Sequence, residues 1–199
     1  MEYTGIVAGV DEVGRGPLAG PVVAACVILD RQKILPDGID DSKKLLKARR
    51  EALYSHLMAE AHVGIGICSV EEIDEHNILG ASKLAMRRAF ELLPLRPDVV
   101  LVDGNQLPDL PCDMHGIIGG DALCVSIAAA SIIAKVTRDR IMEELAKEYP
   151  HYGWQHNAGY GTKLHHEGLA MFGITPHHRR SFAPIRQIVE MMQAQKVAG

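Results

Sequence analysis

Two adjacent carboxylates, Asp11 and Glu12, directly follow the apolar run 6–10 and precede the turn-forming residues Gly14, Arg15 and Gly16. Burying a carboxylate costs free energy unless a cation compensates its charge. A strand that ends in two of them is therefore more typical of a metal or acid–base site than of a core. An arginine between two glycines adds a forked donor that suits phosphate, on a backbone that a ligand can approach closely. The structural alternative is that Asp11 caps a turn and Arg15 pairs with Glu12.

Neighbouring side chains on a strand point to opposite faces of the sheet. Asp11 and Glu12 can therefore serve one site only where the strand ends or bends. Glycine adopts backbone angles that other residues avoid, so Gly14 and Gly16 are suited to such a bend. We expect the strand to bend at residue 12.

Two further acids stand at similar positions. Asp103 belongs to an Asp-Gly pair at the end of the apolar run 99–102, and Asp121 follows two glycines and precedes a long helical pattern. The carboxyl ends of strands are where α/β sheets place their functional residues. The alternatives are a turn aspartate at position 103 and a helix-capping aspartate at position 121.

Taken together, the four acids predict a site for divalent cations. Carboxylate oxygens suit Mg²⁺ or Mn²⁺ better than zinc, and two such ions among several carboxylates can support phosphoryl transfer. Other polar groups are given ordinary roles. Asp139 between two arginines predicts a solvated ion-pair face, and the histidine pairs 165–166 and 177–178 predict polar surface or phosphate contact.

The elements that must position these residues are read from hydrophobic periodicity. The pattern predicts strands at 6–11, 21–29, 61–68, 99–102 and 116–119. It predicts helices at 43–60, at 69–93 with an interruption at Gly80, at 125–148, at 163–172 and at 184–195. Ser69 and Glu72 have the spacing of a capping box. Mixed strands and helices indicate an α/β layer fold.

Length and composition exclude several classes of protein. The chain has 199 residues, 47% hydrophobic and 23% charged, which fits one globular domain. No apolar run approaches the roughly 20 residues that span a bilayer, and no secretion signal is visible. Four scattered cysteines predict reduced thiols. The net charge of −4 combines an acidic region 1–150 with a basic, histidine-rich region 151–199. We expect a cytoplasmic enzyme.

Seven blocks in order make the chain resemble bacterial ribonuclease HII from about residue 5 to 190. They are Asp-Glu-Val-Gly-Arg-Gly-Pro at 11–17, Asp-Ser-Lys-Lys-Leu at 41–45, Val-Asp-Gly at 102–104, Gly-Asp at 120–121, the helix segment 127–139, Gly-Tyr-Gly-Thr at 159–162 and His-Arg-Arg-Ser-Phe at 178–182.

The resemblance implies an α/β ribonuclease H-like fold: a mixed central sheet flanked by helices, with a small helical C-terminal extension. It implies a catalytic domain at 1–150 and an extension at 151–199 packed on it as one structural unit. The implied enzyme is a monomeric, metal-dependent endonuclease. It hydrolyses the RNA strand of RNA–DNA hybrids and incises at single ribonucleotides embedded in duplex DNA. Two Mg²⁺ or Mn²⁺ ions are implied, with 3′-hydroxyl and 5′-phosphate products.

The resemblance also assigns roles by position. The catalytic, metal-binding acids are Asp11, Glu12, Asp103 and Asp121. The turn Gly14, Arg15 and Gly16 matches one whose backbone senses a 2′-hydroxyl, the group that separates RNA from DNA. Tyr160 matches a tyrosine that stacks beside the ribonucleotide. The expected phosphate contacts are Ser42, Lys43, Arg179 and Arg180.

The chain departs from the family pattern at Ala158 and Gly119, where lysines are usual, which predicts weaker or less salt-sensitive binding. A contact with a replication clamp through 187–199 lacks a convincing motif. The rival readings are a resolvase- or transposase-type DNA nuclease on the same architecture and a hybrid-binding protein without catalysis. The turn and Tyr160 argue against the first. Four acids that would repel a phosphate backbone without metal ions argue against the second.

Overall fold

The structure is a computed structural model that describes residues 5–30, 33 and 35–197. Its strands are β1 (Val7–Val13), β2 (Val22–Ile28), β3 (His62–Cys68), β4 (Val99–Asp103) and β5 (Asp113–Ile117). They form one sheet in the order β3-β2-β1-β4-β5. β1 is antiparallel to β2 and parallel to β4, which is parallel to β5. The predicted mixed sheet is confirmed.

The helices are α1 (Lys47–Glu60), α2 (Val70–Glu91), α3 (Gly120–Leu123), α4 (Val125–Glu148), α5 (Trp154–Asn157), α6 (Lys163–Phe172) and α7 (Ala183–Val197), with a 3₁₀ turn at Pro150–Tyr152. None of the helices in the described part of the chain is long and apolar enough to cross a membrane.

The chain divides into two compact units. The first comprises Met1–Val13, Val23–Ile67 and Ser82–Thr137, and the second comprises Gly14–Val22, Cys68–Ala81 and Arg138–Gly199. The first unit contains almost the whole sheet, and the second contains α5, α6 and α7. The division at residue 150 that the sequence implied stays a prediction.

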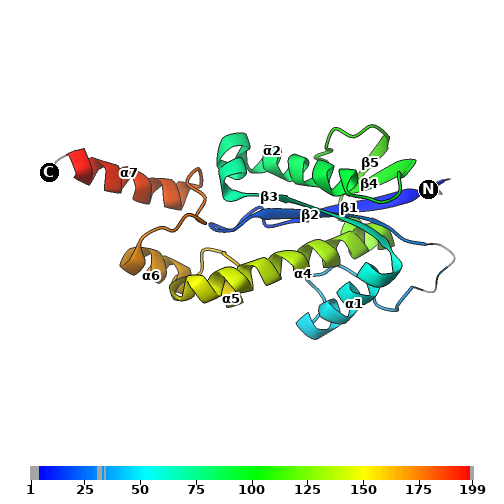
Figure 1. Ribbon diagram of the computed structural model, residues 1–199, viewed down its shortest axis with the longest axis horizontal. Coiled ribbons are helices and arrows are strands. Elements are labelled where there is room, and N and C mark those ends of the chain that lie inside the picture. The colour runs from blue at the N-terminus through cyan, green and yellow to red at the C-terminus, as the bar shows by residue number, and fades with distance from the viewer. Residues whose placement is uncertain (1–4, 31–32, 34, 198–199) are drawn as a thin grey trace. The chain divides into compact units, whose positions relative to one another are not determined.

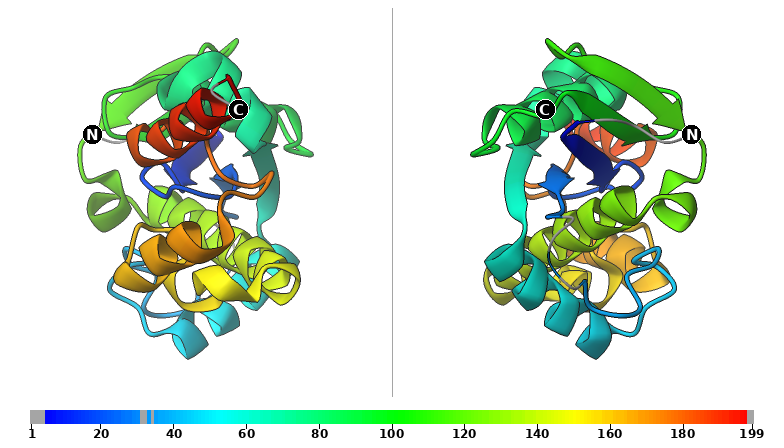
Figure 2. Two further views of the ribbon diagram at one scale, coloured as in Figure 1. Left: turned by 90° about the vertical axis from the view of Figure 1, so that its left-hand side faces the viewer. Right: turned by 90° about the vertical axis from the view of Figure 1, so that its right-hand side faces the viewer.

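In the first unit, helices cover both faces of the sheet. The C-terminal half of α2 lies on one side, and α1 lies on the other with the first part of α4 (Figures 1 and 2). Glycines on the strands allow the helix backbones to come close. A Cβ added at Gly66 would lie 2.0 Å from the Ala85 carbonyl oxygen of α2, and one added at Gly9 would lie 2.2 Å from Ser126 C at the start of α4.

The second unit has its own core. Leu18, Ala19, Met142, Ala146, Tyr152, Trp154, Leu169 and Ile185 form one cluster of buried side chains. Trp154 is 1% exposed and stacks on Tyr152 with 5.1 Å between ring centroids. This core gives the C-terminal helices an apolar surface to pack on within their own unit.

Three element boundaries differ from the sequence prediction. β5 lies at Asp113–Ile117 instead of 116–119, because it is a half-exposed edge strand with little apolar signal. α1 begins at Lys47 instead of 43, after a turn. The break in α2 is at Asn77, with φ 56°, and Gly80 lies inside the following helix. Asn77 Oδ1 accepts hydrogen bonds from Leu79 N and Gly80 N at 2.9 and 3.2 Å, which caps that helix.

The predicted capping box at the start of α2 is confirmed. Ser69 N donates to Glu72 Oε2 at 2.9 Å, and Glu72 N donates to Ser69 Oγ at 3.3 Å. The reciprocal pair satisfies main-chain donors that the first turn of a helix leaves without partners.

We predict that Gly9→Ala lowers the free energy of unfolding by roughly 1–3 kcal/mol, because the added methyl group overlaps the backbone of α4. Urea denaturation followed by circular dichroism measures the change. Gly80→Ala is the matched control, since helix propensity favours alanine and its Cβ meets only His76 Cβ at 3.2 Å. Equal stability of Gly9→Ala and the wild type would contradict the packing described here.

Candidate active site

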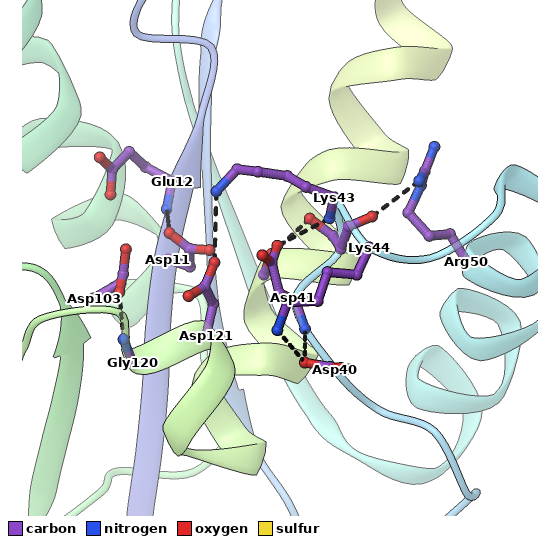
Figure 3. A network of polar contacts seen from close by, with 12 residues as sticks. Asp11, Glu12, Asp40, Asp41, Lys43, Lys44, Arg50, Asp103, Gly120 and Asp121 are labelled. Atoms are coloured by element: carbon purple, nitrogen blue, oxygen red, sulfur yellow. Dashed lines mark hydrogen bonds and ion pairs between the residues drawn. The ribbon is translucent and has the colours of Figure 1, made fainter.

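The first unit brings Asp11, Asp103 and Asp121 to one edge of the sheet (Figure 3). Asp103 is the last residue of β4, and the parallel register pairs Val10 of β1 with Val102 of β4. The next residues along the two strands are Asp11 and Asp103. Parallel pairing thus aligns two acids that are far apart in the sequence.

Asp121 is held near this edge by the short helix α3. Asp103 Oδ1 accepts a hydrogen bond from Gly120 N at 2.7 Å, which fastens α3 to the end of β4. A Cβ at Gly120 would lie 2.6 Å from Ile127 Cδ1, so only glycine fits this position without a shift. Asp121 follows immediately and is 8% exposed.

The pKa of the buried Asp11 carboxyl group reflects the negative charges around it. Its Oδ1 accepts a hydrogen bond from Glu12 N at 2.7 Å, and the side chain is 6% exposed. Burial raises the pKa of Asp11 well above its ordinary value, and the negative charges of Glu12, Asp103 and Asp121 raise it further. The acids are close enough to repel one another.

Glu12 occupies a different place from the one expected. β1 pairs with β2 residue by residue through Val13, so the strand does not bend at residue 12. The chain turns at Gly14 instead, where φ is 100°. Glu12 is half-buried and extends from the strand in a different direction from Asp11 (Figure 3). After burial, the negative charge of Glu12 raises the pKa of Asp11 more than the charges of Asp103 and Asp121 do.

Lys43 reaches the acids from the segment before α1. Its Nζ lies 3.5 Å from Asp121 Oδ2. Partial burial lowers the pKa of Lys43, but the charges of Asp41, Asp121 and Asp11 outweigh it and raise the pKa above its ordinary value. The ammonium group therefore stays protonated and partly neutralises the carboxylates.

Ser42 directly precedes Lys43 in this segment, and its side chain is buried. It is 3% exposed, and its Oγ accepts a hydrogen bond from Ser131 Oγ of α4 at 2.7 Å. Arg50 Nη1 donates to the Ser42 carbonyl at 2.9 Å and also to the Leu45 carbonyl. In this position Ser42 anchors the loop that presents Lys43, whereas the sequence predicted a phosphate contact.

In the second unit, the turn at 14–16 lies beside Tyr160. Arg15 and Gly16 are exposed, and Tyr160 is 48% exposed. A Cβ added at Gly16 would lie 3.4 Å from Tyr160 Cε1. The bare Gly16 backbone and the tyrosine ring therefore present one exposed surface, as a stacked ligand would need.

Arg179 is not at the surface where a phosphate contact was expected. It is 0% exposed, and its guanidinium group donates hydrogen bonds to the main-chain carbonyls of Gly14, Arg15, Gly20 and Pro21. The following residue, Arg180, is exposed, and its N–H donates to Asp74 Oδ2 at 3.0 Å. The phosphate contact of Arg180 stays a prediction.

Two histidines that the sequence placed at a polar surface are buried. Thr175 N donates to His178 Nδ1 at 2.9 Å, so neutral His178 carries its proton on Nε2 and donates it to His165 Nε2 at 3.0 Å. His165 Nδ1 then donates to the Tyr160 carbonyl at 3.0 Å. Burial lowers the pKa of His178 to about 3, so the relay is uncharged at neutral pH.

Comparison with known proteins decides the family. A family model described as ribonuclease HII matches residues 8–185. The chain belongs to the ribonuclease HII family. It is a metal-dependent endoribonuclease, a hydrolase that degrades the RNA of RNA–DNA hybrids.

Relatives cover nearly all of the chain. A curated ribonuclease HII from Granulibacter bethesdensis is 58% identical over 195 residues, 96% of this chain and 89% of that protein. The crystal structure of ribonuclease H2 from Pyrococcus horikoshii has a TM-score of 0.79 at 31% identity, covering 94% of this chain and 99% of that one. Ribonuclease HII from Archaeoglobus fulgidus, solved in complex with PCNA, has a TM-score of 0.73 at 29% identity, covering 87% and 93%. These neighbours confirm the ribonuclease H-like fold.

The donor set of this ribonuclease HII chain fits hard divalent ions. Carboxylate oxygens suit Mg²⁺ and Mn²⁺, and a cation would relieve the repulsion that raises the pKa of Asp11. Among the residues that the structure describes, no three acidic, histidine or cysteine side chains already form a metal-ligating group. The acids are brought near one another by strand pairing and by the Gly120 contact to Asp103, and an ion would draw them closer.

Arg138 is a buried residue that sequence reasoning misread. It was expected on a solvated ion-pair face with Asp139, but it is 0% exposed and donates to the carbonyls of Ala19, Pro21 and Ala158. A signal was present in the spacing: Ile127, Ser131, Ala134, Arg138 and Met142 recur every three or four residues and are all buried.

We predict that Asp11→Asn raises the free energy of unfolding of the metal-free protein by roughly 0.5–2 kcal/mol at pH 8. The amide keeps the acceptor for Glu12 N and removes a buried, repelled charge. The raised pKa means that the folded wild type holds its proton to higher pH than the unfolded chain does. Wild-type stability therefore falls as pH rises from the Asp11 pKa of the unfolded chain to that of the folded protein. The gain from Asp11→Asn shrinks towards acid pH.

Urea titration in EDTA at several pH values measures this difference. Added Mg²⁺ should then stabilise the wild type more than Asp11→Asn. Lower stability of Asp11→Asn in EDTA at pH 8 would contradict the repulsion.

Proposed function

We propose that this chain incises duplex DNA at single embedded ribonucleotides as well as within longer RNA–DNA hybrids. Cleavage of the phosphodiester on the 5′ side of the ribonucleotide would leave 3′-hydroxyl and 5′-phosphate ends. The observation that carries the proposal is the convergence of acids at the ends of β1 and β4, expressed in the raised pKa of Asp11.

Asp11, Glu12, Asp103 and Asp121 are proposed to hold two Mg²⁺ or Mn²⁺ ions. Such a pair of ions activates a water and stabilises the leaving oxygen in phosphodiester hydrolysis. The Asp103 carboxylate has its Oδ1 on Gly120 N, which fixes its orientation. Asp121 is fixed by α3, one residue after that contact. The acids therefore act from backbone positions that are set before substrate arrives.

Lys43 is proposed to exchange partners when substrate binds. Its ammonium group lies 3.5 Å from Asp121 Oδ2, and its side chain is 76% exposed. Divalent ions on the acids would release it to a backbone phosphate. Phosphate contacts of this kind, with Arg180, position the duplex without reading its sequence.

The turn at 14–16 and Tyr160 are proposed to recognise the sugar. The exposed Gly16 has no side chain between its backbone and the Tyr160 ring. Main-chain N–H groups of such a turn can bind a 2′-hydroxyl, which DNA lacks, while the aromatic ring stacks on the neighbouring nucleotide. The turn and Tyr160 would supply a specificity for ribonucleotides that a nonspecific DNA nuclease does not need.

The direct test is a labelled DNA duplex with one ribonucleotide, beside an all-DNA duplex of the same sequence. We expect one cut, on the 5′ side of the ribonucleotide, with Mg²⁺ or Mn²⁺ and none in EDTA. Gel mobility against synthetic markers identifies the ends. Equal cleavage of both duplexes, or cleavage of branched all-DNA junctions, would overturn the proposed specificity.

Asp103→Asn tests the role of the acids. The amide can still accept from Gly120 N, so the fold and duplex binding should persist. We expect kcat to fall by about 100-fold or more, because a negative ligand is lost at the reacting phosphate. Single-turnover cleavage and fluorescence anisotropy measure the two quantities separately. Near-normal kcat would show that Asp103 is only a turn residue.

A further inference from the structure

The second unit buries two arginines whose guanidinium groups donate hydrogen bonds to main-chain carbonyls. Arg179 and Arg138 are each 0% exposed. Burial lowers the pKa of Arg179 to about 9 and that of Arg138 to about 10, so both remain cations at neutral pH. Desolvating a cation is costly unless its surroundings compensate it. A pair of such cations calls for a structural or functional reason.

Arg179 gathers the carbonyls of one turn around its guanidinium group. Its Nη2 lies 2.5 Å from the Gly14 oxygen, its Nη1 lies 3.0 Å from the Arg15 oxygen and its Nε lies 2.9 Å from the Gly20 oxygen. The Phe182 ring covers the group, with its centroid 5.0 Å from Arg179 Cζ. The carbonyls of Gly14, Arg15 and Gly20 therefore all face one planar donor.

The orientation of these carbonyls sets the orientation of the N–H groups. In a trans peptide, C=O and N–H point in opposite directions. The Gly14 carbonyl shares its peptide plane with Arg15 N–H, and the Arg15 carbonyl shares its plane with Gly16 N–H. Because Arg179 holds both carbonyls inward, both N–H groups point away from the buried guanidinium. Successive N–H groups on one side of a turn make a concave donor site.

We infer that Arg179 is a positioning residue for ribonucleotide recognition, which fixes the N–H groups of Arg15 and Gly16 toward the ribose 2′-hydroxyl. This inference rests on the proposed function of the turn. It replaces the phosphate contact that the sequence predicted for Arg179 with a role inside the protein.

Arg138 provides a matched comparison within the same unit. Its guanidinium group donates to the carbonyls of Pro21, Ala158 and Ala19 at 2.9, 2.8 and 3.1 Å. It therefore fastens the far end of the segment 14–21 to the chain before Tyr160. It has the same burial and the same kind of partners as Arg179, but it does not bond the carbonyls of Gly14 or Arg15.

The chemistry of the side chain matters as much as its charge. A lysine in place of Arg179 keeps the positive charge, but a compact ammonium group cannot span carbonyls that are spread along a planar fork. Methionine has a similar length without charge or donors. Arg179→Lys and Arg179→Met therefore separate charge from geometry.

The experiment compares wild type, Arg179→Met, Arg179→Lys and Arg138→Met on duplexes that carry one ribonucleotide or one 2′-fluoro nucleotide at the same site. Fluorine is of similar size but is a much weaker hydrogen-bond acceptor than the hydroxyl oxygen to which the N–H groups of Arg15 and Gly16 would donate. Active enzyme is titrated so that rates refer to folded molecules. We expect Arg179→Met to lose about 100-fold in kcat on the ribonucleotide, the cost of a misplaced contact of about 1 Å. KM should change less than about 3-fold, because the phosphate contacts persist.

The preference for the ribonucleotide should collapse in Arg179→Met, fall partly in Arg179→Lys and survive within about 3-fold in Arg138→Met. If Arg179→Met does not fold, Arg179→Lys carries the test. Wild-type preference in the Arg179 variants would overturn the inference and leave the proposed function standing, as would an equal loss in Arg138→Met. A wild type without preference would overturn the proposed function itself, and the inference with it.

Discussion

Mutual repulsion of carboxylates at the ends of β1 and β4 is the constraint on which the first unit depends. Asp11 is almost completely buried, and three neighbouring acids raise its pKa above its ordinary value. Such a cluster lowers the stability of the metal-free protein. Parallel strand pairing, the Gly120 contact to Asp103 and the Lys43 ammonium hold it together. The repelling acids lower the stability of the metal-free protein, and a bound cation would restore it. Functional sites commonly lower the stability of a protein in this way.

The second unit meets a related constraint with charges of the opposite sign. Arg179 holds the carbonyls of Gly14 and Arg15, in the turn proposed to recognise the sugar. Arg138 and an uncharged histidine relay hold the main chain at 19–21 and at 158–160. Carbonyl oxygens, not carboxylates, accept the hydrogen bonds of both guanidinium groups. Because carbonyl groups are part of the main chain, each of these hydrogen bonds restrains the backbone directly. A rigid backbone is what recognition of a single hydroxyl group requires.

The sequence predicts the positions of most strands and helices well, but it predicts poorly which polar side chains are buried. Apolar runs located β1, β2, β3 and β4, because buried strands are continuous in hydrophobicity. β5 was misplaced, because an edge strand carries little apolar signal. The proximity of Asp11, Asp103 and Asp121 could be anticipated because each carboxylate lies next to the end of a strand or at the start of a helix. Arg138, Arg179, His165 and His178 were assigned to the surface, because polarity alone does not reveal a main-chain partner distant in the sequence. The roles of all these residues in cleavage stay predictions.

The acids form a repelling cluster in this structure, and we expect a divalent ion to relieve the repulsion. The most direct measurement is the pH titration of the Asp11 carboxyl carbon by ¹³C NMR, without and with Mg²⁺. We predict a midpoint above the ordinary value of 3.8 in EDTA, because burial and the neighbouring acids favour the protonated form. The midpoint should fall when Mg²⁺ is added. A midpoint at or below 3.8 in EDTA, or one that Mg²⁺ does not change, would contradict the account.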